Sequence, residues 1–236
     1  MFKTIERSAK GEAAREQILG HALRLFRERG FDATTMRDVA AGAGVALGLA
    51  YYYFPSKEAL VAAYYDQVQS RHAAMLEEEF ERAGTLEERL STVLHTKIDI
   101  LLDDRKLLGA LFRYTGDPDH PLSFLGKATQ PLRAECMELF RRAVEPERLP
   151  RDLADLLPML LWALQMGILL FFLYDASANA QRTRKLIGGS VGLVVRMLGL
   201  AKFPLLRPLR RQVLGVLRDA GLSGDAPQIS AMGETR

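Results

Sequence analysis

The stretch TMRDVAAGAGVALGLAYYYFPSK, which runs from Thr35 to Lys57, gathers side chains that suit the binding of phosphate groups. Tyr51 and Tyr53 offer hydroxyl donors, and Lys57 offers an ammonium group. Because Ser56 is a favoured N-cap residue, Lys57 is expected in the first turn of a helix, where backbone N–H groups and the helix dipole attract anions. The spacing therefore predicts that this stretch binds a polyanion.

Catalysis and metal binding have no comparable pattern. The four histidines are scattered along the chain, at His21, His72, His95 and His120. A Gly-x-Ser-x-Gly sequence surrounds Ser190, but a hydrolase elbow needs a preceding strand and a later histidine. No histidine follows Ser190, and the surrounding pattern is helical. We therefore predict that the protein is not an enzyme and uses neither a metal nor a cofactor, with a helical enzyme as an alternative.

The composition indicates a folded protein whose N-terminal part is basic. Of its 236 residues, 48% are hydrophobic, which is enough for a sizeable core. Residues 1–57 hold nine Lys or Arg and six Asp or Glu, so they account for the net charge of +3. This excess suits a polyanionic partner, and a solvated surface is the alternative. The single cysteine, Cys136, allows no intramolecular disulfide and fits a reducing, cytoplasmic location.

One uncharged run, Leu156–Tyr174, has the length of a membrane-spanning helix, which needs about 20 residues. Pro158 and Gln165 interrupt the run, and Asp155 and Asp175 flank it without nearby basic residues. We expect a helix buried inside a soluble helical assembly and no membrane partner. A membrane-anchored regulator is the alternative.

Apolar residues recur at helical spacing through most of the chain, and strand patterns are nearly absent. We therefore predict an all-α fold. The first four predicted helices are one over residues 12–29, a short one that begins after Thr35, one over 46–53, and one that is capped by Ser56 and ends near Arg82. Six further helices are predicted over residues 85–103, 105–115, 123–144, 151–175, 179–200 and 205–220.

Two short helices joined by a glycine turn are typical of a helix-turn-helix. Thr35 and Asp38 have the spacing of a capping box at the start of the first of these helices. Gly42 and Gly44 supply the turn. Ala46 then begins the second helix without a side chain that can cap it.

The run ALRLFRERGFDATTMRDVAAGAGVALGLAYYYFPSKEAL, from Ala22 to Leu60, closely resembles the N-terminal domain of the tetracycline-repressor (TetR) family. The shared residues are Leu25-Phe26, Gly30-Phe31, Thr34-Thr35, Val39-Ala40, Ala43-Gly44-Val45, Gly48, Tyr51, Tyr53-Phe54 and Ser56-Lys57-Glu58. The resemblance implies a three-helix DNA-binding domain over residues 1–57, with 1–10 as a flexible arm. A long helix would join it to a helical ligand-binding and dimerisation domain over 58–220, followed by a flexible tail over 221–236.

The resemblance also assigns the DNA contacts. It implies phosphate contacts from Thr35, Arg37, Tyr51, Tyr53 and Lys57.

It further implies that Val45, Ala50 and Phe54 pack inward. The exposed edge that reads bases is then Ala46, Leu47, Gly48, Leu49 and Tyr52. Because this edge lacks Arg, Asn and Gln, we predict apolar contact with thymine methyl groups from Leu47 or Leu49, and hydrogen bonding from Tyr52.

The last two long helices form the interface between subunits in the TetR family, so the resemblance implies a homodimer. The predicted interface residues are Phe171, Tyr174, Ile187, Gly188, Val191, Gly192 and Val195. Packing within one subunit is the alternative for these residues.

The resemblance also places a ligand among the helices between residues 85 and 175. The predicted pocket residues are His95, Ile98, Leu102, Phe112, Met137, Phe140, Trp162, Gln165, Met166 and Leu169. This set predicts a small, largely apolar effector oriented by Gln165 or His95. The sequence thus predicts a ligand-responsive repressor that binds double-stranded operator DNA, although activation by the same binding is not distinguished.

Overall fold

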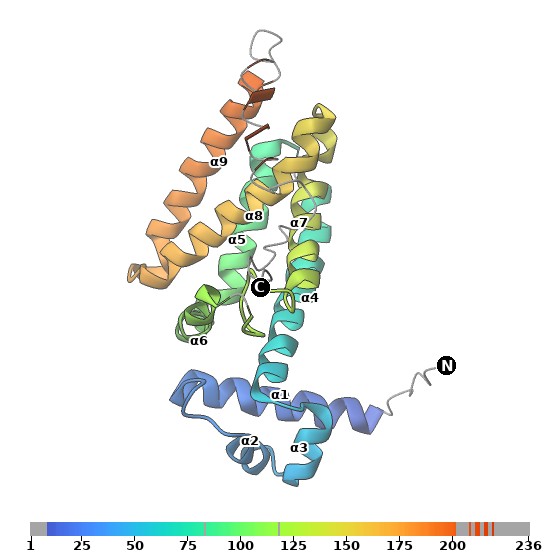
Figure 1. The fold of residues 1–236 in the computed structure, drawn as a ribbon. Helices are drawn as coiled ribbons and strands as arrows, with labels where there is room; N and C mark the ends of the chain where they lie inside the picture. The colour runs from blue at the N-terminus through green and yellow to red at the C-terminus, as the bar shows by residue number, and fades with distance from the viewer. Residues whose placement is uncertain are drawn as a thin grey trace, which may run out of the picture. The chain divides into compact units, whose positions relative to one another are not determined.

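The computed structural model describes residues 9–82, 84–117 and 119–201, together with Pro208, Arg211, Gln212, Gly215, Val216 and Asp219. All regular elements in these residues are helical, which confirms the predicted all-α class (Figure 1). The helices are α1 (Ala9–Arg29), α2 (Met36–Gly42), α3 (Leu47–Tyr53), α4 (Lys57–Arg82), α5 (Leu86–Leu101), η1 (Leu102–Asp104), α6 (Arg105–Phe112), η2 (Arg113–Gly116), α7 (Gln130–Val144), η3 (Glu145–Glu147), α8 (Arg151–Tyr174), η4 (Ala178–Ala180) and α9 (Gln181–Ala201), where η marks a 3₁₀ helix.

Some predicted segments fall wholly or largely outside the described residues. These are the tail over 221–236, most of the arm over 1–10 and most of the helix over 205–220. Within the described part, α1 begins at Ala9, three residues before its predicted start.

The described residues form two compact units, and neither is one continuous piece of chain. The first unit contains the residues up to Ser70 together with Asp103–Thr129. The second contains Arg71–Leu102 and the residues from Gln130 onwards. Helix α4 therefore contributes to both units. This division differs from the linear boundary predicted between residues 57 and 58, because side chains of the segment after Asp103 bond to those of the N-terminal helices.

The first unit is built around a core that α1, α2, α3 and the start of α4 share (Figure 1). Its fully buried side chains include Phe26 on α1, Val39 on α2 and Ala50 on α3. The Phe26 ring lies 5.3 Å from the ring of Phe31, which closes the core at the end of α1. The stripe of apolar residues predicted on the first helix thus faces the helix-turn-helix.

The second unit packs α5, α7, α8 and α9 against one another (Figure 1). Helix α8 is the most apolar of these, and among the described helices it alone has the length and composition to cross a membrane. In the structure, 56% of that apolar window is buried. Trp162, Gln165 and Phe172 all face inward, and α7 and α9 both pack against the helix. Helix α8 therefore forms part of the core of this helical unit.

Helix α7 begins at Gln130, seven residues after the predicted start at residue 123. Hydrogen bonds across the preceding segment explain the difference. The Thr129 hydroxyl donates to the carbonyl oxygens of Ser123 and Gly126, and the Ser123 amide donates to the carbonyl of His120. These bonds hold residues 120–129 as a series of turns, although their apolar pattern resembles that of a helix.

Candidate nucleic-acid interface

Helix α2 begins with the predicted capping box. The Asp38 amide donates to the Thr35 hydroxyl oxygen at 3.2 Å, and the Thr35 amide donates to the Asp38 carboxylate at 2.8 Å. The hydrogen bonds from Thr35, followed by the nearby charge of Arg29, lower the pKa of Asp38. The Thr35 side chain therefore fixes the start of α2, while Arg37 in its first turn is exposed.

The turn between α2 and α3 depends on Gly44, whose φ of 65° lies in the left-handed region. The Val45 amide donates to the Ala40 carbonyl at 3.0 Å across this turn. From α1, the Gln17 side chain donates to the Ala43 carbonyl at 2.8 Å. The turn is thereby tied to α1, and this contact helps to set the direction of α3.

Helix α3 is held by few side chains and exposes most of its surface. Ala46 stands at its N-cap without a side-chain hydrogen bond, as the sequence predicted. Ala50 and the following Phe54 are buried, and Val45 is half-buried. Tyr52 is 71% exposed.

The other residues of the predicted reading edge are also accessible. Ala46, Gly48 and Leu49 are exposed, and Leu47 is half-buried. Of the tyrosines expected to contact phosphate, Tyr51 is exposed and Tyr53 is half-buried with its ring packed edge-on against Tyr52. The accessible surface of α3 is thus apolar and aromatic, without a charged side chain.

Lys57, in the first turn of α4, has a structural role besides the predicted phosphate contact. Its ammonium donates to the Phe31 carbonyl at 2.8 Å and to the Asp32 carbonyl at 3.4 Å. It also lies 4.5 Å from the centroid of the Phe31 ring. The Ser56 hydroxyl accepts from the Ala59 amide at 3.2 Å, so it caps α4 as predicted. Lys57 therefore joins the start of α4 to the turn that follows α1.

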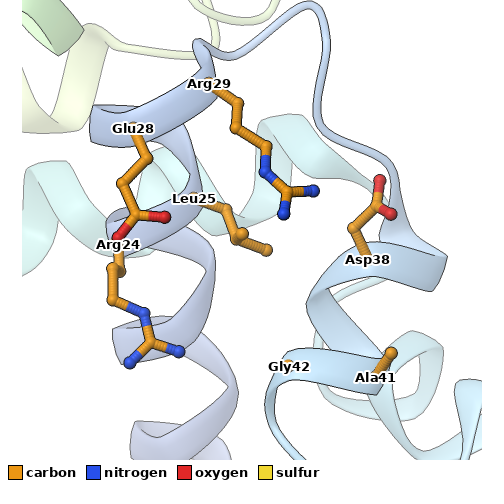
Figure 2. A pocket seen from close by; sticks show the side chains of 7 residues that line it. All are labelled: Arg24, Leu25, Glu28, Arg29, Asp38, Ala41 and Gly42. Carbon is orange, nitrogen blue, oxygen red and sulfur yellow. The ribbon is translucent and has the colours of Figure 1, made fainter.

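An open hollow of about 480 Å³ lies between α1 and α2 in the first unit (Figure 2). Its lining residues are Arg24, Leu25, Glu28, Arg29, Asp38, Ala41 and Gly42. Figure 2 shows the Arg29 side chain extending from α1 towards the side of the hollow that holds Asp38. Because two arginines and two acids line it, the hollow has no single sign of charge that would select an anion or a cation.

The predicted pocket residues divide between the two units. Most of them lie in the second unit, where the buried ones are Ile98, Met137, Phe140, Trp162, Gln165 and Leu169. His95, Leu102 and Met166 are half-buried there. Phe112 instead belongs to the first unit, where its ring lies 4.9 Å from that of Phe124. Phe112 is therefore assigned to a different compact unit from the other predicted pocket residues.

The predicted dimer residues also divide, by the direction in which they face. Phe171 and Tyr174 on α8 are exposed, Tyr174 by 82%. Gly188 is exposed, and Gly192 and Val195 are half-buried.

Ile187 and Val191 are fully buried within the subunit, on the face of α9 that packs against α5 and α8. These two residues are therefore core residues rather than surface residues. The exposed apolar side chains of α9 are instead Leu186, Leu193, Met197 and Leu200.

The sequence patterns did not reveal that three charged residues would be buried. Lys97 and Arg133 are buried in the second unit, and Asp104 is buried in the first. The only available signal was their position among apolar residues at helical spacing, which does not reveal what a charged side chain contacts.

Comparison with protein families gives two matches. The family described as "Bacterial regulatory proteins, tetR family" matches residues 18–64. The family described as "Tetracyclin repressor-like, C-terminal domain" matches residues 89–213. The first covers the helix-turn-helix, and the second covers more than half of the chain.

Several curated proteins resemble the chain in part. It is 32% identical over 111 residues to the HTH-type transcriptional repressor KstR2 of Rhodococcus jostii (strain RHA1), a match that covers 43% of this chain and 54% of that protein. It is 28% identical over 91 residues to the fatty acid metabolism regulator protein of Bacillus subtilis (strain 168), which covers 39% of this chain and 47% of that protein. The chain thus spans about half the length of these relatives.

Solved structures share the fold over a longer stretch. A TetR transcriptional regulator from Nitrosomonas europaea ATCC 19718 has a TM-score of 0.61 at 21% identity, covering 76% of this chain and 96% of that one. The fatty acid degradation regulator FadR from Bacillus halodurans has a TM-score of 0.59 at 18% identity, covering 75% and 94%. At these identities the likeness concerns the fold alone.

Proposed function

This chain belongs to the TetR family of DNA-binding transcriptional regulators, and we propose that it is a repressor that binds a palindromic operator as a homodimer and leaves it when a small, largely apolar effector binds. The family is not enzymatic. Its members are soluble regulators, which is consistent with a cytoplasmic location.

The single observation that carries the proposal is the exposed face of α3. In a helix-turn-helix the second helix enters the major groove and presents side chains to base edges. Here Leu49 is 38% exposed and Tyr52 is 71% exposed, while Ala50 anchors the opposite face. Leu49 can contact thymine methyl groups, and the Tyr52 hydroxyl can bond to a base edge. Tyr51, Tyr53, Lys57, Thr35 and Arg37 would then contact phosphates on either side, which fixes the position of α3 on the duplex.

An exposed apolar face on α8 and α9 supports the homodimer. Leu193, Met197 and Leu200 recur at the spacing of one helix face, and they are 58%, 60% and 56% exposed. On α8, Phe171 and Tyr174 add two exposed aromatic rings. An apolar stripe of this kind is costly in water and favours burial against a second copy. Pairing two copies places their recognition helices about 34–36 Å apart, one turn of DNA.

The effector proposal rests on the interior of the second unit and on relatives. Ile98, Phe140, Trp162 and Leu169 are buried there, so an apolar compound would find apolar neighbours. One relative carries the name of a transcriptional repressor, and another that of a fatty acid metabolism regulator, which fits repression relieved by an apolar compound. The effector would act by its higher affinity for the form of the dimer that does not fit the operator, with α4 as the helix common to both units.

Selection of bound DNA from a random pool, with the purified full-length dimer, tests the proposal. We expect a palindromic consensus whose half-site centres are about 10 base pairs apart. The matched control is a dimer carrying Tyr52→Ala, which keeps the buried side of α3 and should lose enrichment of that consensus. If a folded wild-type dimer enriches no sequence, the proposed function is wrong.

A further inference from the structure

Asp32, in the turn after α1, binds two side chains of η2. The Arg113 guanidinium donates to one oxygen of its carboxylate at 2.8 Å, and the Tyr114 hydroxyl donates to the other at 2.7 Å. The hydrogen bond from Tyr114, followed by the charge of Arg113, lowers the pKa of Asp32, so the carboxylate is ionised near pH 7. Each of its oxygens therefore has a donor from within the first unit.

Two other rings hold Tyr114 in this position. Its ring stacks on that of His120, with the centroids 4.1 Å apart and an angle of 8° between the planes. The buried ring of Phe31 meets it edge-on, with the centroids 5.8 Å apart. His120 is itself fixed, because its Nδ1 accepts from the Leu122 amide at 3.1 Å. The packing of these rings therefore directs the Tyr114 hydroxyl towards Asp32.

Lys57 contacts the same turn but binds its backbone. Its ammonium donates to the carbonyl oxygens of Phe31 and Asp32. Among the residues that the structure describes, no carboxylate forms an ion pair with Lys57. Neutral carbonyls hold the ammonium in place without cancelling its charge. An ammonium has three donors, so one remains for a phosphate oxygen.

The carboxylate of Asp32 would compete for Lys57 if it were released. The carbonyl that accepts from Lys57 belongs to the same residue, so rotation of the Asp32 side chain can bring the carboxylate to the ammonium. The charge of Lys57 already contributes to the lowered pKa of Asp32. Such a pair would occupy the ammonium with a protein carboxylate in place of a DNA phosphate. Arg113 and Tyr114 oppose it by binding both carboxylate oxygens.

We propose that Arg113 and Tyr114 are positioning residues for operator binding. By holding the Asp32 carboxylate, they leave the Lys57 ammonium available to a DNA phosphate. This assignment rests on the proposed function, because it requires Lys57 to contact the operator. Neither Arg113 nor Tyr114 has to touch DNA. A segment outside the helix-turn-helix thereby contributes to operator affinity.

The salt dependence of operator binding measures the contribution of Lys57. Each phosphate contact adds about 0.9 to the slope of log affinity against log salt concentration, and a dimer carries two copies of Lys57. Lys57→Met should therefore reduce the slope by about 1.8 and the affinity about thirtyfold at about 0.15 M salt. Fluorescence anisotropy with the selected operator and the full-length protein measures both quantities. An unchanged slope would overturn the assignment.

A double variant releases the Asp32 carboxylate. Arg113→Met with Tyr114→Phe removes both donors and keeps the stacked ring. Because the ion pair is exposed on both sides, the variant should fold. We expect operator affinity to fall about fivefold and the salt slope to become shallower. Lys106→Met is the matched control, since it removes an exposed positive charge from α6 and leaves both donors in place. Unchanged affinity in the folded double variant would contradict the positioning role.

Rescue by Asp32→Asn distinguishes this competition from a purely structural role. Added to the double variant, it removes the competing charge, restores the net charge of the wild type and does not restore the lost ion pair. Affinity should return to about the wild-type value. Asp103→Asn, which removes another exposed carboxylate of the same unit, is the control and should not restore it. If Asp32→Asn restores no more affinity than Asp103→Asn, the bonds only shape the turn and the proposed competition is wrong.

The wild-type protein separates this assignment from the proposed function. If the wild-type dimer selects an operator and the double variant binds it with the same affinity and salt slope, the positioning role is wrong and the regulator stands. If the folded wild-type dimer selects no DNA, the proposed function is wrong, and the positioning role fails with it.

Discussion

The guanidinium of Arg27 on α1 forms an ion pair with the carboxylate of Asp104, although 77 positions separate them in the sequence. The other carboxylate oxygen of Asp104 accepts a hydrogen bond of 2.9 Å from the Tyr64 hydroxyl on α4. The hydrogen bond that Arg27 donates to Asp104, together with the charge of that carboxylate, raises the pKa of Arg27 despite partial burial. One buried carboxylate therefore joins α1, α4 and the start of α6 within the first unit.

Asp104→Ala is expected to destabilise the protein by about 2–3 kcal/mol, chiefly because it leaves the buried Tyr64 hydroxyl without its acceptor and also removes the ion pair of the exposed Arg27. Chemical denaturation followed by circular dichroism measures the change. The control is Arg141→Ala, which breaks an exposed pair with Glu138 and should change stability by less than about 0.5 kcal/mol. Equal effects of the two substitutions would contradict the role of Asp104.

The bonds of Asp104 also show why the division of the chain into two compact units was not predictable from the sequence. A second pair of bonds, from Arg113 and Tyr114 to the carboxylate of Asp32, likewise joins the segment after Asp103 to the turn after α1. Partners about 80 positions apart share no periodic pattern in the sequence. Within the part of the chain that the structure describes, periodicity predicted each α-helix correctly as a helix, but only the folded chain reveals which helices share a compact unit.

Local rules performed better within the helix-turn-helix. The capping box at Thr35, the absent side-chain cap at Ala46 and the cap at Ser56 all depend on residues within four positions of one another, and the structure confirms them. The predicted start of α7 at residue 123 was wrong. Hydrogen bonds from the Thr129 hydroxyl to the carbonyl oxygens of Ser123 and Gly126 hold this segment in turns, although its apolar pattern is that of a helix. The DNA contacts and the effector pocket stay predictions, since their partners are other molecules.

Gly44 and Gly48, both in the helix-turn-helix, are expected to have opposite effects on stability when each is replaced by alanine. Gly44→Ala should cost about 1–2 kcal/mol, because its φ of 65° is unfavourable for a residue with a Cβ. Gly48 lies within α3, and a Cβ there meets no atom within 4 Å, so Gly48→Ala should stabilise by about 0.5–1 kcal/mol. Thermal unfolding of the two variants gives both values. A loss of stability in Gly48→Ala would show that α3 is constrained in some other way.

Uracil substitution tests readout by the apolar edge of α3. Replacing each operator thymine with uracil removes one methyl group, so at a contacted position affinity should fall about fourfold. In the Leu49→Ala variant, replacing the thymine that Leu49 contacts with uracil should no longer change the affinity, since the side chain that contacts the methyl group is absent. Fluorescence anisotropy with labelled duplexes measures the ratios. If no position loses affinity with the wild-type protein, direct readout of thymine is wrong.

Met197→Glu is expected to convert the dimer into a folded monomer that binds the operator weakly. The side chain is 60% exposed in one subunit, so a charge there does not disturb the core but opposes burial against a second copy. Lys185→Glu is the control, because Lys185 lies on α9 about a quarter of a turn away from the exposed stripe. Analytical ultracentrifugation measures the oligomeric state. A Met197→Glu variant that remains a dimer would move the interface away from α9.

The position of this stripe explains the error on Ile187 and Val191. The apolar residues of α9 extend over a broad arc of the helix, so spacing alone does not decide which part of that arc faces the core. The structure buries Ile187 and Val191 within the subunit and exposes Leu193 and Met197. An apolar pattern identifies the faces of a helix that can be buried. The packing of the neighbouring helices determines which of these faces is buried within the subunit.

His72 makes stability depend on pH. Its pKa falls from 6.5 to about 3 on folding, because burial disfavours the charged imidazolium. Below pH 6.5 the unfolded chain therefore binds a proton that the folded chain does not, and stability is lost as the pH falls towards 3. Between pH 6.5 and about pH 5 the expected loss is about 2 kcal/mol, at about 1.4 kcal/mol for each pH unit.

Comparison with His72→Gln isolates this contribution from the titration of carboxylates in the same range. A glutamine amide can still donate to the Val93 carbonyl, as His72 Nε2 does at 2.9 Å, but it does not titrate. Urea unfolding at a series of pH values should give a shallower dependence for the variant, with the difference growing below pH 6.5 and absent above it. Parallel curves for the two proteins would mean that His72 is protonated in the folded state or accessible to water.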